Sequence, residues 1–349
     1  MKQKARVFGK IAIFLIILAI LIRLLEIPFS PAYWFPLNRL QDRTGRIGAI
    51  TLEKENTIDI VCMGDSLSVM GFSPMDLWKE YGFTSYNFGS DGLRMGEAYY
   101  HAKLFDRNQN PKVLLLETGL FFRYNMMEEL QTIVAQEIYY HFSGLRYHNL
   151  WKQPFELEGV RRYYKGYLIN ETCTPYEDGY YMDQKFHWTM LMEIKPIIRE
   201  HFDMLKEYCD KHDITLILYS APSAANYNHD RCKLLSDCAE ENGLAYFNLN
   251  EDIPELGIDW STDTTDGGDH MNLFGARKVT RYLAEYIKSE NLAEDHRGDP
   301  DYADWDVQAK AFDKLVAEMK GTYFGNIEEE RDRALREERE RRREERKQR

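Results

Sequence analysis

The sequence predicts an α/β fold with a parallel sheet. Five short apolar, β-prone runs alternate with segments of helical character, and the first run leads directly into a Gly-Asp-Ser turn. Strands that alternate with helices in this way are typical of parallel sheets. The predicted strands are Ile58 to Cys62, Thr84 to Phe88, Val113 to Glu117, Ile214 to Ser220 and Leu244 to Leu249.

Helical segments separate or follow these strands. They are Pro74 to Glu80, Arg94 to Phe105, Ile194 to His212, Arg231 to Asn242 and Phe274 to Ser289. The stretch 121–192 interrupts the regular alternation, because it is dense in aromatic residues and irregularly spaced. We expect it to be an insertion of helices and loops over the sheet edge. Its aromatic side chains either pack the insertion itself or line an acyl or sugar pocket.

The amino terminus predicts a transmembrane helix in residues 1–27. Four basic residues precede an apolar run, and Phe8 to Ile27 is about 20 residues long, which is enough to cross a bilayer. A cleaved signal peptide is the alternative, but no small-residue cleavage site follows the run, so a signal anchor is favoured. The leading positive charges predict a cytoplasmic amino terminus, with the remainder of the chain outside the cell membrane.

Three further segments follow the anchor. Residues 28–50 contain three prolines and are expected to form a juxtamembrane linker. The catalytic domain is predicted at 51–290, followed by a carboxyl-terminal extension, 291–349. The end of this extension, from Glu328, is almost purely Glu and Arg, which predicts a solvated, charged helix or, alternatively, a partner-binding or lipid-headgroup segment.

Composition excludes several function classes. The chain of 349 residues has a formal net charge of −12 although its amino terminus is basic, so the body is acidic and lacks the footprint of a nucleic-acid-binding protein. There is no Gly-x-Gly-x-x-Gly after a strand, no P-loop and no His-x-x-x-His pair, so we expect no cofactor and no metal. The five cysteines lack zinc-type spacing, and the sequence leaves open whether Cys232 and Cys238 form a disulfide.

Chemistry is predicted at the turn Gly64-Asp65-Ser66, because open α/β sheets keep ligands at the carboxyl ends of their strands. A serine hydroxyl needs a positioned base, normally a histidine that a carboxylate orients. The segment 264–276 offers both in one loop: Asp266, a Gly-Gly pair and His270. Asn272 is placed to cap the helix that follows.

These two motifs together resemble the SGNH/GDSL hydrolase superfamily, whose closing motif is Asp-x-x-His followed by Asn and Gly. The similarity spans about residues 55–290. It implies a three-layer α/β/α sandwich of flavodoxin type with five parallel strands, and acyl transfer through an acyl-serine. By position, Ser66 resembles the nucleophile and His270 the general base. The Ser66 N–H and Gly92, in Asn-Phe-Gly-Ser-Asp-Gly, resemble the oxyanion hole.

The sequence departs from the family pattern twice. The third block, Gly-x-Asn-Asp, is replaced, and Phe121 stands where an oxyanion-donating Asn is expected. Asp266 precedes His270 by four residues rather than three, while Asp269 is adjacent to it. We favour Asp266 as the residue that orients His270, with Asp269 as the alternative.

Three polar residues of the same motifs are candidates for substrate contacts. They are Asp65, Asn87 and Asn272.

The altered third block and the membrane anchor resemble a narrower group, the membrane-anchored SGNH proteins of the DltD and alginate-acetylation type. This resemblance implies an acyltransferase or esterase that acts on a cell-envelope glycopolymer, with a membrane-bound O-acyltransferase as partner. Two alternatives remain. One is a non-catalytic SGNH-fold subunit that binds polymer or scaffolds the acyltransferase; the other is a cytosol-facing scaffold with inverted topology. The sequence does not identify the acyl group or the acceptor.

Overall fold

The fold contains a parallel sheet flanked by helices, as predicted. The structure is a computed structural model that describes residues 2–30, 43–148, 163–185 and 192–319. Within these residues, five parallel strands form one sheet in the order β2-β1-β3-β6-β7. The strands are β1 (Ile60–Met63), β2 (Ser85–Asn87), β3 (Val113–Glu117), β6 (Thr215–Ser220) and β7 (Ala245–Asn248).

Strand β1 lies between β2 and β3. Val61 is in register with Tyr86 on one side and with Leu114 on the other. Every residue of β1 and of β3 is buried, because helices cover both faces of a parallel sheet and leave no solvated side. The loops that leave β1, β2 and β3 therefore meet at one edge of the sheet.

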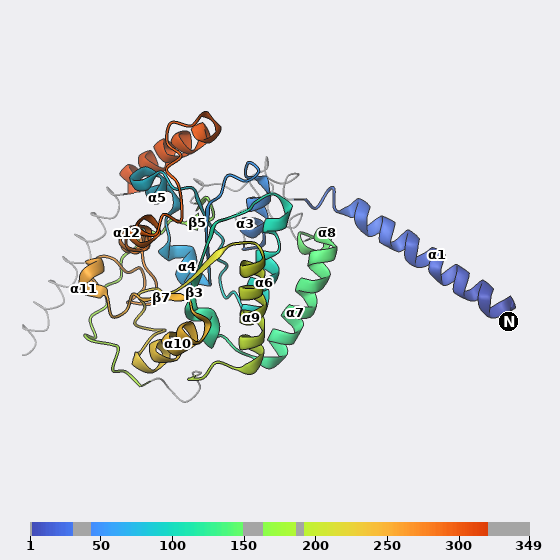
Figure 1. The fold of residues 1–349 in the computed structure, drawn as a ribbon, viewed down its shortest axis with the longest axis horizontal. Helices are drawn as coiled ribbons and strands as arrows, with labels where there is room; N and C mark the ends of the chain where they lie inside the picture. The colour runs from blue at the N-terminus through green and yellow to red at the C-terminus, as the bar shows by residue number, and fades with distance from the viewer. Residues whose placement is uncertain (1, 31–42, 149–162, 186–191, 320–349) are drawn as a thin grey trace, which may run out of the picture.

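Helices cover the two faces. In Figure 1, α5 and α12 lie on one side of the strands, whereas α6 and α9 lie on the other. The main helices are α4 (Ser66–Gly71), α5 (Pro74–Tyr81), α6 (Met95–Ala102), α9 (Pro196–Lys211), α10 (His229–Asn242) and α12 (Leu273–Ser289), with a short α11 (Ile253–Leu256). Each predicted helix is found, with ends that shift by a few residues, as is usual where helix ends fray.

The amino-terminal helix α1 (Lys2–Leu25) contains the predicted apolar span. Its segment Arg6–Leu25 has a mean hydropathy of 2.6 and none of it is buried within the described chain. The length and composition are those of a helix that can cross a membrane. The predicted linker 28–50 is more structured at its end than expected, since α3 (Arg43–Ala49) places Ile47 in the core and Ile50 of the next turn is also fully buried.

The insertion at 121–192 is partly helical. After the 3₁₀ turn Thr118–Phe122 come α7 (Met126–His141) and α8 (Ser143–Arg146), then a two-stranded hairpin, β4 (Tyr163–Tyr164) and β5 (Tyr167–Leu168), which the sequence did not indicate. Its later segment runs beside the loop that carries His270: the N–H of Gly267 donates to the carbonyl of Thr174 at 2.9 Å.

Residues 303–319 form a further helix that packs on α5. The rings of Trp78 and Trp305 lie 5.4 Å apart, and the indole of Trp78 donates to Asp306 at 3.0 Å. The extension after 290 thus begins as part of the packed domain. The predicted charged helix from Glu328 lies outside the described residues.

Asn87 connects the end of β2 to helix α4. Its side-chain amide donates to the carbonyls of Ser68 and Phe72 at 2.7 and 2.8 Å, and its oxygen accepts from the N–H of Gly89 at 3.1 Å. Because Asn87 is buried, these carbonyls have no access to water as a substitute partner. Asn87 therefore has a structural position, which does not support the expected substrate contact.

We predict that Asn87→Ala lowers the free energy of unfolding by about 1–3 kcal/mol, because it leaves buried carbonyls without a donor. Urea unfolding of the full chain in detergent measures this loss. Gln131→Ala, at an exposed position of α7, is the control. Equal stability losses in the two variants would contradict this role of Asn87.

Candidate active site

The turn after β1 places Ser66 at the amino terminus of α4. Asp65 caps this helix, since its Oδ1 accepts from the N–H of Leu67 at 3.0 Å. Gly64 is confined, because a Cβ built there would lie 2.4 Å from the Cβ of Glu117. The sequence therefore folds into a tight strand-to-helix turn whose next side chain, Ser66, is only half-buried.

The second motif approaches Ser66 from a loop more than 200 residues later in the chain. Nε2 of His270 lies 2.7 Å from Oγ of Ser66, and Nδ1 of His270 lies 2.7 Å from Oδ2 of Asp266. If Nδ1 carries the ring proton and donates it to Asp266, Nε2 is left free to accept the hydroxyl proton. The three side chains are thus arranged as a nucleophile, a base and an orienting carboxylate.

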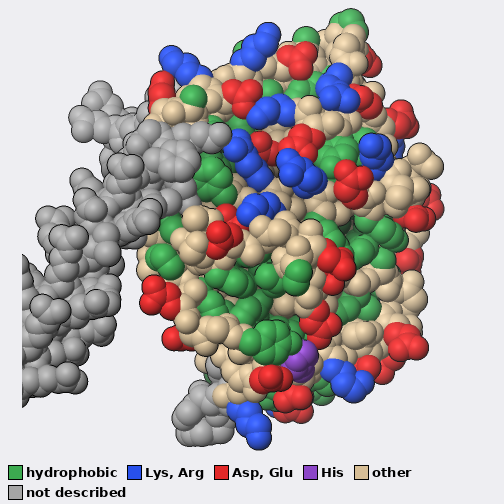
Figure 2. Space-filling model, turned by 90° about the vertical axis from the view of Figure 1, so that its left-hand side faces the viewer, with side chains coloured by type: hydrophobic (Ala, Val, Ile, Leu, Met, Phe, Trp, Pro, Cys, Tyr) green, Lys and Arg blue, Asp and Glu red, His purple; other side chains and the backbone are tan. Residues whose placement is uncertain are grey.

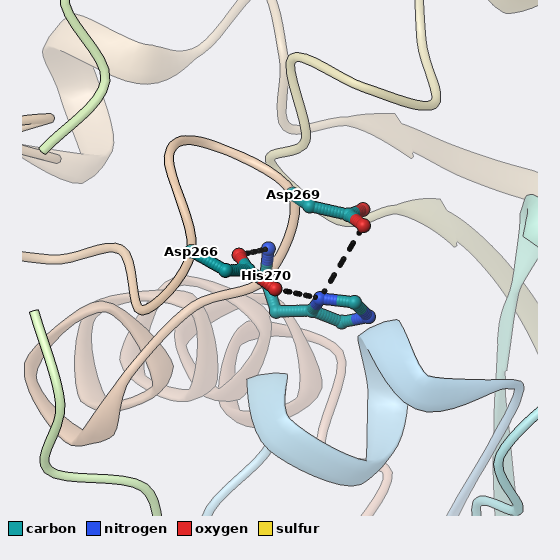
Figure 3. Close-up of side chains that lie close together, drawn as sticks. All are labelled: Asp266, Asp269 and His270. Atoms are coloured by element: carbon teal, nitrogen blue, oxygen red, sulfur yellow. Dashed lines mark hydrogen bonds and ion pairs between the residues drawn. The ribbon is translucent and has the colours of Figure 1, made fainter. Parts of the chain in front are cut away.

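The loop geometry explains why Asp266 reaches His270 across four residues. Gly267 and Gly268 both adopt positive φ, 73° and 93°, which the Gly-Gly pair permits without strain. This path turns Asp266 back so that its Oδ1 also accepts from the backbone N–H of His270 at 2.8 Å. Figure 3 shows the carboxylate of Asp266 against both the ring and the backbone of His270.

Asp269 lies farther from the imidazole. Its Oδ2 is 3.6 Å from Nδ1 of His270 (Figure 3). Its Oδ1 accepts from the amide of Asn226 at 2.5 Å. Asp266, Asp269 and His270 together place three ligand-type atoms within 4.8 Å of one another. Because Nδ1 of His270 already bonds to Asp266, this cluster needs no metal to account for it.

Three nearby carboxylates raise the pKa of His270. Burial lowers the pKa of His270, but the hydrogen bond to Asp266 and the negative charges of Asp269, Asp266 and Asp65 outweigh it, so the pKa lies above its ordinary value. Burial raises the pKa of Asp266, yet its hydrogen bonds from His270 lower it more. Asp266 thus stays ionised beside an imidazole of raised basicity.

The loop after β2 runs beside the Ser66 turn. The N–H of Ser90 donates to the carbonyl of Gly64 at 2.9 Å, and a Cβ on Gly89 would lie 2.3 Å from Oγ of Ser68. Gly92 follows with φ of 67°. Among the described residues, no acceptor is found for the N–H of Ser66 or of Gly92, so both remain available as donors.

Two of the expected substrate-contact residues have hydrogen-bond partners within the chain. Asn272 is fully buried and caps α12, as predicted, accepting from the N–H groups of Phe274 and Gly275 while it donates to the carbonyl of Thr262 at 2.7 Å. Asp65 is buried as well, and its second oxygen accepts from Arg123 at 2.8 Å. Like Asn87, these side chains hold the motifs in place.

Phe121, where the resemblance described above predicts an Asn, is a core residue. Its ring is fully buried and packs against Phe202 with the ring centres 4.9 Å apart. Two residues later, Arg123 points back toward the site: Nη2 lies 2.8 Å from Oδ2 of Asp65, and Nη1 lies 3.9 Å from the position of a Cβ on Gly92. Sequence reasoning missed Arg123, because nothing in its spacing links it to either motif.

Glu117 is a second residue that sequence reasoning missed. It ends the apolar strand β3 fully buried and accepts from the hydroxyl of Tyr227 and the N–H groups of Gly119 and Ala221. Burial and then the negative charge of Asp65 raise the pKa of Glu117 to about 8, against these hydrogen bonds, which lower it. An acidic residue closing an otherwise apolar buried strand was the available signal.

Comparisons with known proteins give only two structural similarities of low score. No protein-family model matches the sequence, and no curated protein matches it. A solved protein from Desulfitobacterium hafniense DCB-2, named as a lipolytic protein of the G-D-S-L family, is similar at 12% identity and a TM-score of 0.34, over 66% of this chain and 99% of its own. One from Bacteroides fragilis NCTC 9343, named as an acylhydrolase, is similar at 13% identity and a TM-score of 0.36, over 69% and 92%. TM-scores this low carry no functional weight, so the function is inferred from the side-chain geometry.

We predict that Asp266→Asn lowers the maximal rate of ester cleavage by about 10³–10⁴-fold, because the imidazole loses its orienting acceptor. Removing this acceptor also lowers the pKa of His270, so the rising limb of kcat/KM against pH moves to lower pH. Stopped-assay rates from pH 5 to 9 measure both effects. Asp269→Asn is the matched control and should leave the maximal rate near that of the unaltered chain; the reverse order would make Asp269 the orienting residue.

Proposed function

We propose that the protein is a serine-dependent esterase or acyltransferase that works through an acyl-serine. The observation that carries this proposal is the continuous contact from Asp266 through His270 to Ser66, with both links at 2.7 Å, at the carboxyl end of β1. Such a chain serves to deprotonate a hydroxyl, and its place in the sheet is where α/β enzymes bind substrates.

The reaction proceeds in two halves. Oγ of Ser66 attacks the carbonyl carbon of the ester while its proton passes to Nε2 of His270. The tetrahedral intermediate collapses, and the leaving alcohol takes that proton, which gives the acyl-serine. A water molecule or a sugar hydroxyl then attacks the acyl carbon and gives its proton to His270. Oγ of Ser66 leaves and recovers the proton.

The oxyanion that forms on the acyl group needs donors. The N–H groups of Ser66 and Gly92 are two candidates, and we assign the third place to Arg123 in the absence of the family's Asn. Its guanidinium reaches the Ser66 turn through Asp65 and stands next to Gly92. Because Asp65 balances its charge, Arg123 suits a hydrogen-bonding role better than the capture of an anionic substrate.

The substrate class and location are part of the same proposal. The apolar span Arg6–Leu25 supports a membrane anchor with the catalytic domain outside the cell, and an anchored esterase has fixed neighbours in the cell envelope. We therefore propose a cell-envelope glycopolymer as acceptor or substrate, with a membrane-bound O-acyltransferase as a partner that supplies acyl groups.

A non-catalytic polymer-binding subunit is the alternative. The observation in its favour is Phe121, since the expected donor has been replaced by a core side chain. The observation against it is the short contact of His270 with both Asp266 and Ser66. Figure 2 adds that acidic and basic side chains are interspersed on one face of the molecule, which is unlike the broad basic surface of a polyanion-binding protein.

We predict that Ser66→Ala abolishes hydrolysis of a p-nitrophenyl acyl ester and the covalent labelling of the chain by a fluorophosphonate, because the attacking oxygen is removed. Complementation of a deletion strain separates the two functions: failure of Ser66→Ala to restore polymer acylation supports catalysis. Full rescue by Ser66→Ala would establish the non-catalytic alternative.

We predict that Arg123→Ala lowers kcat of ester hydrolysis by about 10²–10³-fold with little change in KM, the usual effect of losing one oxyanion donor. Added guanidinium should restore part of the rate, which a purely structural defect would not allow. Arg199→Ala, which removes a surface ion pair with Glu241, is the control. An unchanged kcat in Arg123→Ala would show that the oxyanion is stabilised from elsewhere.

A further inference from the structure

Helix α7 buries two polar side chains against the protein. Its buried positions are Glu129 and Gln136. The carboxylate of Glu129 accepts from the N–H of Gly96 at 3.1 Å, and the amide of Gln136 donates to Glu97 at 3.1 Å. Much of the inner face of α7 is thus held to α6 by buried hydrogen bonds.

The outer face of α7 is apolar. Its exposed large apolar side chains, here called the α7 stripe, are 44% to 65% accessible to solvent. They are Met126, Met127, Leu130, Val134 and Ile138. At 100° per residue these positions fall within roughly a third of the helix circumference, a continuous stripe. The charged side chains on this arc, Glu137 and His141, lie near its carboxyl end and pair with each other at 3.1 Å.

This arrangement is the reverse of a helix on a water-soluble protein. Such a helix buries its apolar stripe and solvates its polar face, because both choices lower the free energy of folding. In α7, burying Glu129 and Gln136 while exposing five apolar side chains is favourable only if the outer face meets an apolar medium. The residue pattern therefore indicates that something apolar covers the α7 stripe.

The position of α7 indicates what covers it. Its carboxyl end continues into α8, which meets the end of α1: the backbone of Glu26 lies 3.1 Å from the position of a Cβ on Gly144, and the guanidinium of Arg23 lies 5.3 Å from the ring centre of Phe142. In Figure 1, α7 lies on the side of the domain that faces α1 and runs crosswise to it. A helix with this placement lies along the surface of a bilayer that α1 crosses.

We propose that the α7 stripe lies in the interfacial region of the membrane that α1 spans, as a second contact between the domain and the bilayer. This inference rests on the proposed membrane insertion of α1 and is independent of the chemistry at Ser66. A surface-lying helix inserts its apolar face about 5–10 Å into the boundary between headgroups and acyl chains. The contact stops the domain from rotating freely about its anchor.

The contact also fixes the active site relative to the membrane. Arg123 lies three residues before the start of α7, and Asn125 caps the helix by accepting hydrogen bonds from the N–H groups of Met127 and Glu128. The segment that reaches the Ser66 turn therefore leads directly into the membrane-bound helix. Substrates held at the membrane surface would meet the site in one orientation.

The test uses the full chain, inserted at one copy per nanodisc, with an environment-sensitive nitrobenzoxadiazole label on one introduced cysteine. The five native cysteines are all buried, which limits labelling to the new site. The variants are Val134→Cys in the α7 stripe and Val307→Cys, a matched exposed valine of 67% accessibility on the helix packed against α5. Ile16→Cys within α1 verifies insertion.

We expect the label at 134 to emit at shorter wavelength than the label at 307, and lipids with a nitroxide near the headgroup to quench it at least about twofold more strongly, because it lies in the interface. Equal quenching at 134 and 307 would overturn the proposal. A blue shift at 134 without lipid quenching would also overturn it, in favour of a protein partner. A label at 16 that lipids with a nitroxide near the end of the acyl chain do not quench would refute the anchor and this inference with it, while leaving the Ser66 chemistry untouched.

A second pair of variants removes the stripe itself. Leu130→Ser with Val134→Ser should abolish the quenching of a label introduced as Ile138→Cys, while ester hydrolysis in detergent remains at the level of the unaltered chain. These positions are exposed, so their replacement leaves the packed core intact. Persistent quenching at 138 in the double variant would count against the stripe as the membrane contact.

Discussion

The position of β1 between β2 and β3 is the constraint on which the candidate site depends. Parallel pairing with β2 and with β3 brings the turns that follow all three strands to one edge. The turn after β1 is then fixed from both sides: Ser90 donates to the carbonyl of Gly64, and Glu117 packs directly under Gly64. Ser66 emerges from this clamped turn with its side chain directed at His270, at a distance of 2.7 Å. A side chain whose backbone is held in this way loses little freedom when a substrate binds.

The acidic side chains beneath the site are each either neutral or paired with a basic group. Glu117 is fully buried, and burial with the charge of Asp65 raises its pKa to about 8, so it is largely neutral at pH 7. Asp65 pairs with Arg123 at 2.8 Å, and the hydrogen bonds from His270 hold the pKa of Asp266 below its ordinary value. Two adjacent buried carboxylates would otherwise repel each other, a cost that protonation of one of them removes. The same arrangement brings the Arg123 guanidinium close to the Ser66 turn and Gly92.

Two consecutive parts of the helical insertion have different surroundings: the first contacts the core and the Ser66 turn, and the second, α7, has an exposed apolar face. The 3₁₀ turn Thr118–Phe122 contributes Phe121 to the core, and Arg123 next to it reaches the Ser66 turn. Helix α7 then leaves the site and presents an apolar face to the side of the domain where α1 ends. What the sequence shows as an irregular, aromatic-rich stretch is therefore a connection between the catalytic edge and the side of the domain nearest α1. The later segment of the insertion returns to the site, because the carbonyl of Thr174 accepts a hydrogen bond from the loop that carries His270.

Local patterns in the sequence determined the five strands and the principal helices, because apolar runs and capping residues act over a few residues. The same patterns indicated the apolar span in α1 and the cap at Asn272. They also drew attention to Ser66, Asp266 and His270 as chemically suited residues. Which partners each side chain has was decided only by the tertiary structure. The burial of Asn87, the approach of Arg123 to Asp65 and the inverted burial of α7 all depend on contacts between distant segments, which no local pattern encodes.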